Sequence, residues 1–320
     1  MKAIVAKEFG PPEVMKLEDV ETPRPAGPQV LVRVKAIGVN PVETYIRSGN
    51  YPGVPPPPYT PGKDASGVVE AVGDDVTKWK IGDRVYTANS ISGTYAENTL
   101  CEEIDLGRLP ENVSFERGAG IWTPYATSYR ALFQKAHAKA GETVLIHGAS
   151  GGVGIAAVQW AKNAGLKVFG TASSDEGKTL VANQGANAVF DHSQDGYLAE
   201  ITDATGDKGL DVIIEMLANV NLEKDFDVLK MFGRITVVGN RGSLDFNPRV
   251  IMAKDATVYG MALYNSPQAD RDEIHTAIFD GLGKGYLNPI VRKSLPLADA
   301  VLAHYEVIES KASGKIVLLP

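Results

Sequence analysis

Six short apolar segments recur at nearly equal intervals through the middle of the chain. They begin near Thr143, Lys167, Ala188, Asp211, Arg234 and Thr257, so that successive starts are 24, 21, 23, 23 and 23 residues apart. Each is followed by a segment of helical character or by a turn, and a strand, a helix and two loops need about this length. The spacing predicts an α/β unit, a six-stranded parallel sheet with helices on both faces.

The residues before this region have a different pattern. Short apolar runs at 30–37, 66–73 and 82–86 are separated by many glycines and prolines, which is typical of a compact, mostly β unit. The four prolines at 55–58 cannot be helical, so we expect a surface loop inside that unit.

The end of the chain returns to short mixed segments. We expect its last run, 314–320, to pair as a strand in the first unit, because the parallel sheet is already complete at six strands. The predicted outer domain therefore comprises residues 1–124 and 265–320, and the inserted α/β domain comprises residues 125–264.

The composition limits the partners of the chain. Hydrophobic residues make up 44% of the 320 residues and the net charge is −7, which disfavours nucleic acid and anionic lipid. The uncharged stretch 143–161 contains four glycines, so we expect a buried strand, turn and helix there and no membrane span. The single cysteine, Cys101, cannot form an internal disulfide, and the first residues do not resemble a secretory signal. We expect a cytoplasmic protein.

The strongest local motif is a glycine-rich turn. An apolar strand ends in His147-Gly-Ala-Ser-Gly-Gly-Val-Gly154 and an apolar helix follows, with Ala149 where the commoner fingerprint has its first glycine. Such glycines either serve packing alone or let a pyrophosphate approach the N–H groups at the helix N-terminus. The position of the turn, at the opening of the α/β region, favours dinucleotide binding.

The second strand distinguishes between the two nicotinamide cofactors. An NAD site carries an acidic residue at the end of this strand to hold the ribose hydroxyls, whereas the run 167–174 ends without one. Lys178, His192 and Arg241 are basic groups that suit a 2′-phosphate. We therefore predict NADPH as the cofactor.

Several stretches resemble a single family. They are Gly38-Val-Asn-Pro-Val-Glu-Thr-Tyr-Ile-Arg-Ser-Gly49, Gly82-Asp-Arg-Val85, the glycine turn, Glu215-Met-Leu-Ala-Asn-Val-Asn221 and Val238-Gly-Asn-Arg-Gly242. With these stretches the sequence resembles the zinc-independent quinone oxidoreductases of the ζ-crystallin type, in the medium-chain dehydrogenase/reductase superfamily. The resemblance implies a Rossmann domain inserted into a GroES-like catalytic domain, and an NADPH-dependent quinone oxidoreductase.

The resemblance also implies a cofactor site. The implied residues are Ser150, Gly151, Gly152 and Val153 at the pyrophosphate; Ser173, His192, Asn240 and Arg241 at the adenosine phosphate; and Tyr45, Asn221, Met261 and Leu263 along the nicotinamide and its ribose. The predicted cofactor-binding residues also include Lys178, Val238, Gly239 and Ala262. Relatives often have Gly in place of Ser173 and Ser in place of Asn240. Both departures are small and polar, so they cast little doubt on NADPH.

A metal site is not expected. Zinc-dependent relatives have a Cys before the first helix and a Gly-His-Glu further on, where this chain has Asn40 and Gly62-Lys63-Asp64. A zinc catalytic site needs three protein ligands, and a charged lysine cannot be one of them.

Without a metal, the cofactor supplies the chemistry and the protein supplies position and a hydrogen bond. A quinone suits such a site, because its oxygen becomes a delocalised phenolate that needs a donor rather than a Lewis acid. Tyr45 and Asn40 are the candidate catalytic donors, and Thr123, Tyr51 and Tyr264 are candidate further donors or walls of the pocket. Ordinary aromatic packing is the alternative for the last two, and a backbone cap is the alternative for Asn40.

Two other functions stay open at this stage. Reduction of the conjugated C=C bond of an alkenal or enone uses the same hydride and similar donors. A nucleotide-binding protein with a structural or RNA-binding role is the non-enzyme alternative, which the negative charge disfavours.

The assembly is predicted from the sixth strand. The segment 257–263 would leave an unpaired sheet edge that a second copy can satisfy, so we expect a homodimer, with a tetramer as the alternative.

Overall fold

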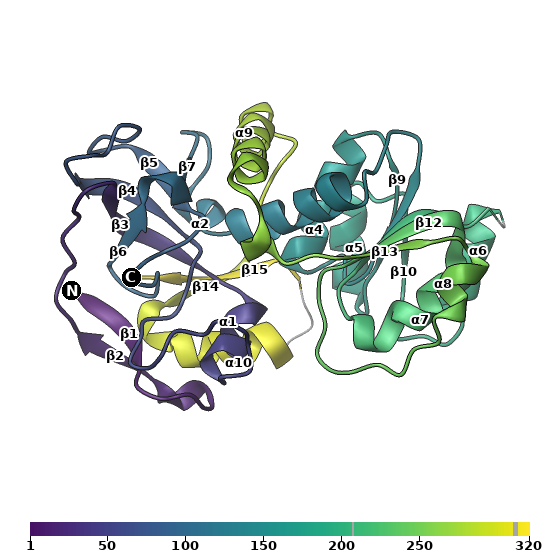
Figure 1. Cartoon of the computed structure of the whole chain (residues 1–320), viewed down its shortest axis with the longest axis horizontal. Helices are drawn as coiled ribbons and strands as arrows, with labels where there is room; N and C mark the ends of the chain where they lie inside the picture. Colours follow the sequence, from purple (N-terminus) through teal and green to yellow (C-terminus); the bar gives the residue numbers. More distant parts are fainter. Residues whose placement is uncertain (207, 310–312) are drawn as a thin grey trace.

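The computed structural model describes residues 1–206, 208–309 and 313–320. It has two lobes, with a parallel sheet in one and a mostly antiparallel sheet in the other (Figure 1). None of the described helices is long and apolar enough to cross a membrane.

The parallel sheet has the six strands that the spacing predicts, in the order β10-β9-β8-β11-β12-β13. The strands are β8 (Thr143–Ile146), β9 (Lys167–Thr171), β10 (Ala188–Phe190), β11 (Leu210–Glu215), β12 (Leu229–Val237) and β13 (Thr257–Gly260). The helices that follow them are α4 (Gly152–Asn163), α5 (Asp175–Gln184), α6 (Tyr197–Thr205), α7 (Ala218–Val228) and α8 (Arg249–Ala253). This is the strand order of a Rossmann fold.

Helices on both faces explain why these strands carry apolar side chains on both of their faces. In β8 the side chains of Val144 and Ile146 enter the core that contains α4, whereas Leu145 enters the core on the other face. Successive side chains of a strand point to opposite faces, so a sheet covered on both sides needs apolar residues at every position.

One strand begins earlier than its apolar pattern indicates. The pattern places the start of the fifth strand at Arg234, but β12 begins at Leu229, directly after α7. Its pairing with β11 is interrupted, because Leu210 pairs with Leu229 and the regular register resumes only at Val212 and Arg234. The residues between these pairs are irregular, and Phe232 has a φ of 62°. This part of the strand therefore lacks the regular pattern of apolar residues by which a strand is predicted.

The other lobe is built on a seven-stranded sheet and corresponds to the mostly β unit that the sequence predicts. Its strands are β3 (Gln29–Val39), β4 (Ala65–Val72), β5 (Arg84–Thr87), β6 (Asn98–Glu102), β7 (Leu106–Arg108), β14 (Val291–Pro296) and β15 (Lys315–Leu319), and a hairpin of β1 (Lys2–Ala6) and β2 (Met15–Asp19) lies beside them. The helices of this part and of the junction are α1 (Pro41–Arg47), α2 (Phe115–Gly118), α3 (Thr127–Tyr129), α9 (Gln268–Lys284) and α10 (Ala300–Glu309).

The C-terminal run returns to this lobe as the sequence predicts. Strand β15 pairs antiparallel with β3 and parallel with β14. The run also touches the inserted domain, because the N–H of Gly314 donates to the carbonyl of Ser150 at 2.8 Å. The C-terminal segment therefore joins the glycine turn to the outer sheet.

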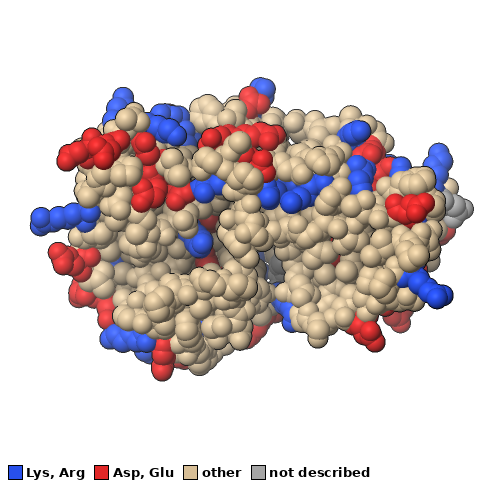
Figure 2. All heavy atoms as spheres, in the orientation of Figure 1, with Lys and Arg blue, Asp and Glu red and all other residues tan. Residues whose placement is uncertain are grey.

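Helical segments connect the two lobes. Residues Trp122–Ala126 lead into α3, and the indole N–H of Trp160 in α4 donates to the carbonyl of Tyr125 at 3.1 Å. The predicted domain boundary at 124/125 falls inside this helical stretch, and the boundaries stay a prediction. Between the lobes the molecular surface is hollowed, and acidic and basic side chains are interspersed over the face shown in Figure 2.

Candidate active site

The glycine turn links β8 to α4 at the centre of the parallel sheet. Gly148 has a φ of +56°, and a Cβ on Gly154 would lie 2.5 Å from the carbonyl oxygen of Gly148, so the tight turn depends on glycine at both positions. Gly151 caps α4 without a side chain, which leaves the first N–H groups of the helix open to an anion. Ser150 lies in this turn and Gly152 and Val153 begin α4, where the resemblance puts the pyrophosphate.

The remaining predicted cofactor residues follow the ends of the other strands. Ser173 follows β9; His192 follows β10; Asn221 is on α7, after β11; Val238, Gly239, Asn240 and Arg241 follow β12; and Met261, Ala262 and Leu263 follow β13. The carboxyl ends of parallel strands share one edge of a sheet, and dinucleotides bind there, where the strand order reverses. The structure thus gathers these residues at one edge, and their contacts with the cofactor stay a prediction.

The basic groups predicted for the 2′-phosphate already have partners. The ammonium of Lys178 lies 2.9 Å from the carboxylate of Asp175 and 3.3 Å from that of Asp191. The pKa of Asp191 is lowered to about 2, chiefly by hydrogen bonds from Ser193 and then by Lys178. Sequence reasoning missed Asp191, which follows β10 and not the second strand, where an NAD-type acid would lie.

His192 lies close to the second strand. Its Nδ1 is 3.1 Å from the hydroxyl of Thr171, the last residue of β9. Burial lowers its pKa, and the nearby His147 lowers it further.

The loop after β12 contacts the other lobe. Asn219 holds this loop, because its backbone N–H donates to the side chain of Asn240 and its side-chain oxygen accepts from the N–H of Arg241, both at 3.0 Å. The guanidinium Nε of Arg241 then donates to the hydroxyl of Tyr45 at 3.1 Å. The resemblance implies different ends of the cofactor for Arg241 and Tyr45, whereas the structure puts their side chains in contact.

The carboxylate of Asp64 brings Asn40 and Thr123 together. In the sequence, Asp64 stands out only in the segment that replaces the Gly-His-Glu of zinc-dependent relatives. Asp64 Oδ1 accepts from the hydroxyl of Thr123 at 2.7 Å, and Oδ2 accepts from the amide of Asn40 at 3.1 Å. The same amide also donates to Glu43 at 3.2 Å, so both of its hydrogens have acceptors. The capping alternative for Asn40 fits this geometry, since it forms a capping box with Glu43 at the start of α1.

Lys315 completes this buried group. Its ammonium lies 3.7 Å from Asp64 and donates to the side-chain oxygen of Asn40. Burial lowers the pKa of Lys315, which the charges of Asp64 and Glu43 oppose, and burial raises the pKa of Glu43. The only sequence signal for Lys315 is a lysine at the start of an apolar terminal run.

Two aromatic residues predicted to line the pocket also meet. The rings of Tyr51 and Tyr264 lie edge to face with their centroids 6.3 Å apart, although the residues belong to distant parts of the chain. A separate cavity of about 580 Å³ lies beside the proline-rich loop and is lined by Glu43, Ile46 and Lys63, among others. Tyr45, Asn40 and Thr123 do not line that cavity.

Comparison with known proteins identifies the family. Two family models match the chain, the alcohol dehydrogenase GroES-like domain over residues 26–134 and the zinc-binding dehydrogenase over residues 152–279. The quinone oxidoreductase of Homo sapiens is 49% identical over 321 residues, which cover 100% of this chain and 98% of the relative. The chain belongs to the quinone oxidoreductase family.

Solved structures of quinone oxidoreductases share the fold. The Escherichia coli quinone oxidoreductase in complex with NADPH matches with a TM-score of 0.91 and 31% identity, covering 100% of both chains. The enzyme of Pseudomonas syringae pv. Tomato DC3000 matches with a TM-score of 0.91 and 34% identity, covering 100% of this chain and 99% of that one. The predicted family and fold, a Rossmann domain within a GroES-like catalytic domain, are confirmed.

The zinc in the name of one family model does not fit the residues present. At the positions that correspond to zinc ligands in the zinc-dependent relatives, both amide hydrogens of Asn40 donate to carboxylates, and Asp64 accepts three hydrogen bonds beside the ammonium of Lys315. The charge of Asp64 is already balanced, and a zinc site would need three free ligands. We therefore route no chemistry through a metal at these residues.

Proposed function

We propose that this quinone oxidoreductase reduces quinones with NADPH and without a catalytic metal. The observation that carries the proposal is the 49% identity with a quinone oxidoreductase over the whole chain, together with the glycine-rich turn at the N-terminus of α4. NADPH supplies the hydride when it is bound. The residues of the chain bind it, orient it and provide the hydrogen bond that the reduced oxygen needs.

The pyrophosphate is held by the turn of Ser150–Val153. Its N–H groups and the dipole of α4 supply positive charge without a lysine. At the far end, Arg241, His192 and Lys178 are the groups for the 2′-phosphate, and Lys178 is also paired with Asp175 and Asp191. NADPH is therefore preferred over NADH.

The hydrogen-bond donor to the substrate is Tyr45 rather than Asn40. The Tyr45 hydroxyl accepts from Arg241, and its own hydrogen has no acceptor among the residues that the structure describes. Both amide hydrogens of Asn40 have buried acceptors, so Asn40 acts by holding Asp64 and the start of α1 in place. Thr123 likewise donates to Asp64.

The function is tested by turnover on a panel of acceptors. Initial rates with NADPH and with NADH on ortho-quinones, para-quinones and 2-alkenals should show quinones as the best substrates and NADPH as the better cofactor. The same rates after exhaustive chelation, with elemental analysis of the protein, should be unchanged and should find no stoichiometric zinc. Faster reduction of alkenals would favour the C=C reductase alternative, and NADPH binding without turnover would favour the non-enzyme alternative.

Assembly and location complete the proposal. Strand β13 forms one edge of the parallel sheet, which supports a homodimer that pairs these edges, with a tetramer as the alternative. Light scattering at micromolar concentration should give twice the chain mass. A cytoplasmic location is supported by the single buried cysteine, Cys101, which has no disulfide partner.

A further inference from the structure

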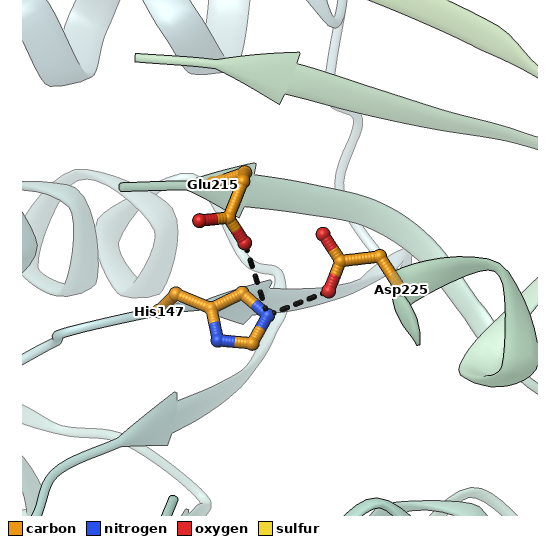
Figure 3. A group of neighbouring side chains, drawn as sticks. All are labelled: His147, Glu215 and Asp225. Carbon is orange, nitrogen blue, oxygen red and sulfur yellow. Dashed lines mark hydrogen bonds and ion pairs between the residues drawn. The ribbon is translucent and has the colours of Figure 1, made fainter. Parts of the chain in front are cut away.

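Three buried ionisable groups meet beneath the glycine turn. Nε2 of His147, just after β8, lies 2.8 Å from Oδ1 of Asp225 in α7 and 3.5 Å from Oε2 of Glu215, the last residue of β11 (Figure 3). All three side chains are at most 4% exposed. In the sequence, His147 stands out only as the first residue of the glycine turn.

Glu215 connects this buried group to the cofactor edge of the sheet. Its Oε1 accepts from the backbone N–H of Leu217 and from the amide of Asn221 at 3.2 Å. Its backbone carbonyl accepts from the N–H groups of Val238 and Gly239, at 2.8 and 3.2 Å. One residue therefore fixes the turn after β11 and the loop after β12, both of which carry predicted cofactor residues.

The second carboxylate oxygens of the group need a proton. Oε2 of Glu215 and Oδ2 of Asp225 are buried and have no hydrogen-bond partner among the described residues. Two buried carboxylate oxygens without donors cost free energy, and one proton shared between them supplies a donor and removes one charge. Burial and the neighbouring carboxylate raise the pKa of Glu215 to about 7, and burial raises that of Asp225 to about 8.

The spacing fits a proton better than a metal ion. The histidine nitrogen and the aspartate oxygen are a hydrogen-bond length apart, 2.8 Å. Two ligands of a tetrahedral zinc ion would be separated by about 3.4 Å, given bonds of roughly 2.1 Å.

We propose that Glu215 is a positioning residue for hydride transfer: a proton shared with Asp225 beside His147 holds its carboxyl group, which in turn orients Asn221 toward the nicotinamide. This inference rests on the proposed function, because Asn221 matters only where the nicotinamide lies beside it. The other titratable groups that interact with the cluster are His192 after β10 and Tyr197 of α6. When the pH rises and the shared proton leaves, both carboxylates become charged and the turn loses its fixed geometry.

The test compares charge removal with side-chain removal. In Glu215→Gln the amide oxygen still accepts from Leu217 and Asn221, and the NH₂ group donates to Asp225 as the protonated acid does. Glu215→Ala removes both this acceptor and this donor. NADPH affinity, followed by cofactor fluorescence, and kcat and KM for a quinone are measured from pH 5.5 to 9.5. Asp227→Asn, an exposed carboxylate on the same helix, is the control.

The wild type and Asp227→Asn should lose NADPH affinity and kcat/KM above about pH 7.5. Glu215→Gln should lack this alkaline decline and retain at least tenfold more kcat/KM at pH 7 than Glu215→Ala. A decline that persists in Glu215→Gln would overturn the proposal, and so would a profile that shifts when one equivalent of zinc is added. A wild type that binds NADPH with this pH dependence but reduces no quinone would refute the proposed function alone.

Discussion

The guanidinium of Arg241 donates to the hydroxyl of Tyr45 at 3.1 Å, and this bond joins residues 196 positions apart. Tyr45 belongs to α1 of the outer domain, and Arg241 to the loop after β12 of the parallel sheet. The contact therefore spans the two lobes beside the predicted cofactor edge. It couples a candidate substrate donor to a candidate phosphate ligand.

Arg241→Ala is expected to weaken NADPH binding far more than NADH binding. A charge-assisted hydrogen bond to the 2′-phosphate contributes about 1.5–3 kcal/mol, so the Kd for NADPH should rise roughly tenfold to a hundredfold. Titration calorimetry with both cofactors measures this. An equal loss of affinity for both cofactors would show that Arg241 does not bind the 2′-phosphate and only holds Tyr45 in place.

Tyr45→Phe is expected to lower kcat and to leave NADPH affinity nearly unchanged. If the hydroxyl donates to the developing phenolate, its loss removes one bond to charge, about 1.5–3 kcal/mol, and kcat falls roughly tenfold to a hundredfold. The loss should be larger with an alkenal than with a quinone, because the hydroquinone anion is already stabilised. Single-turnover stopped-flow rates for both substrates measure the effect, and rates identical to those of the wild type would exclude the donor role.

Lys315→Met is expected to destabilise the fold. The substitution leaves Asp64 buried without its cation, and removing one partner of a buried ion pair costs about 3 kcal/mol or more. Urea denaturation should therefore show a lower midpoint at an unchanged m-value. Lys284→Met is the matched control, because its ion pair with Asp280 is exposed and its loss should leave the urea midpoint nearly unchanged.

The His147 cluster should make the stability fall as the pH rises. The pKa values of Glu215 and Asp225 are raised in the folded chain, to about 7 and about 8, so their contribution is complete at low pH and is lost as the pH rises through these values. Burial lowers the pKa of His147, which acts in the opposite sense only below its ordinary value of 6.5. Between pH 6.5 and 8.5, therefore, the effect of the two carboxylates on the stability can be measured without the opposing effect of His147.

Denaturation of the wild type and of Asp225→Asn across this window measures the effect. The wild type should lose about 1 kcal/mol or more relative to the variant, since one pH unit of proton uptake corresponds to about 1.4 kcal/mol. If the free energy of unfolding had the same pH dependence in the two proteins, the cluster would not titrate between pH 6.5 and 8.5. Asp227→Asn should follow the wild type.

The sequence by itself determined the parts of this protein that depend on local pattern. The spacing of the apolar runs specified six parallel strands, and the turn at His147–Gly154 specified a dinucleotide site, because periodicity and glycine geometry are local properties. The start of β12 at Leu229 was missed, since an interrupted register leaves no regular pattern.

Only the tertiary structure decided which polar side chains share a site. Lys315 lies 275 positions from Asn40, and Asp225 lies 78 positions from His147, yet each pair is buried together. No pattern in the sequence shows that residues so far apart along the chain are in contact. A charged side chain needs a partner when it is buried, and the packing of the sheets decides which side chains are buried together. The residue types of Asp64, Glu215 and Lys315 alone therefore do not reveal their roles.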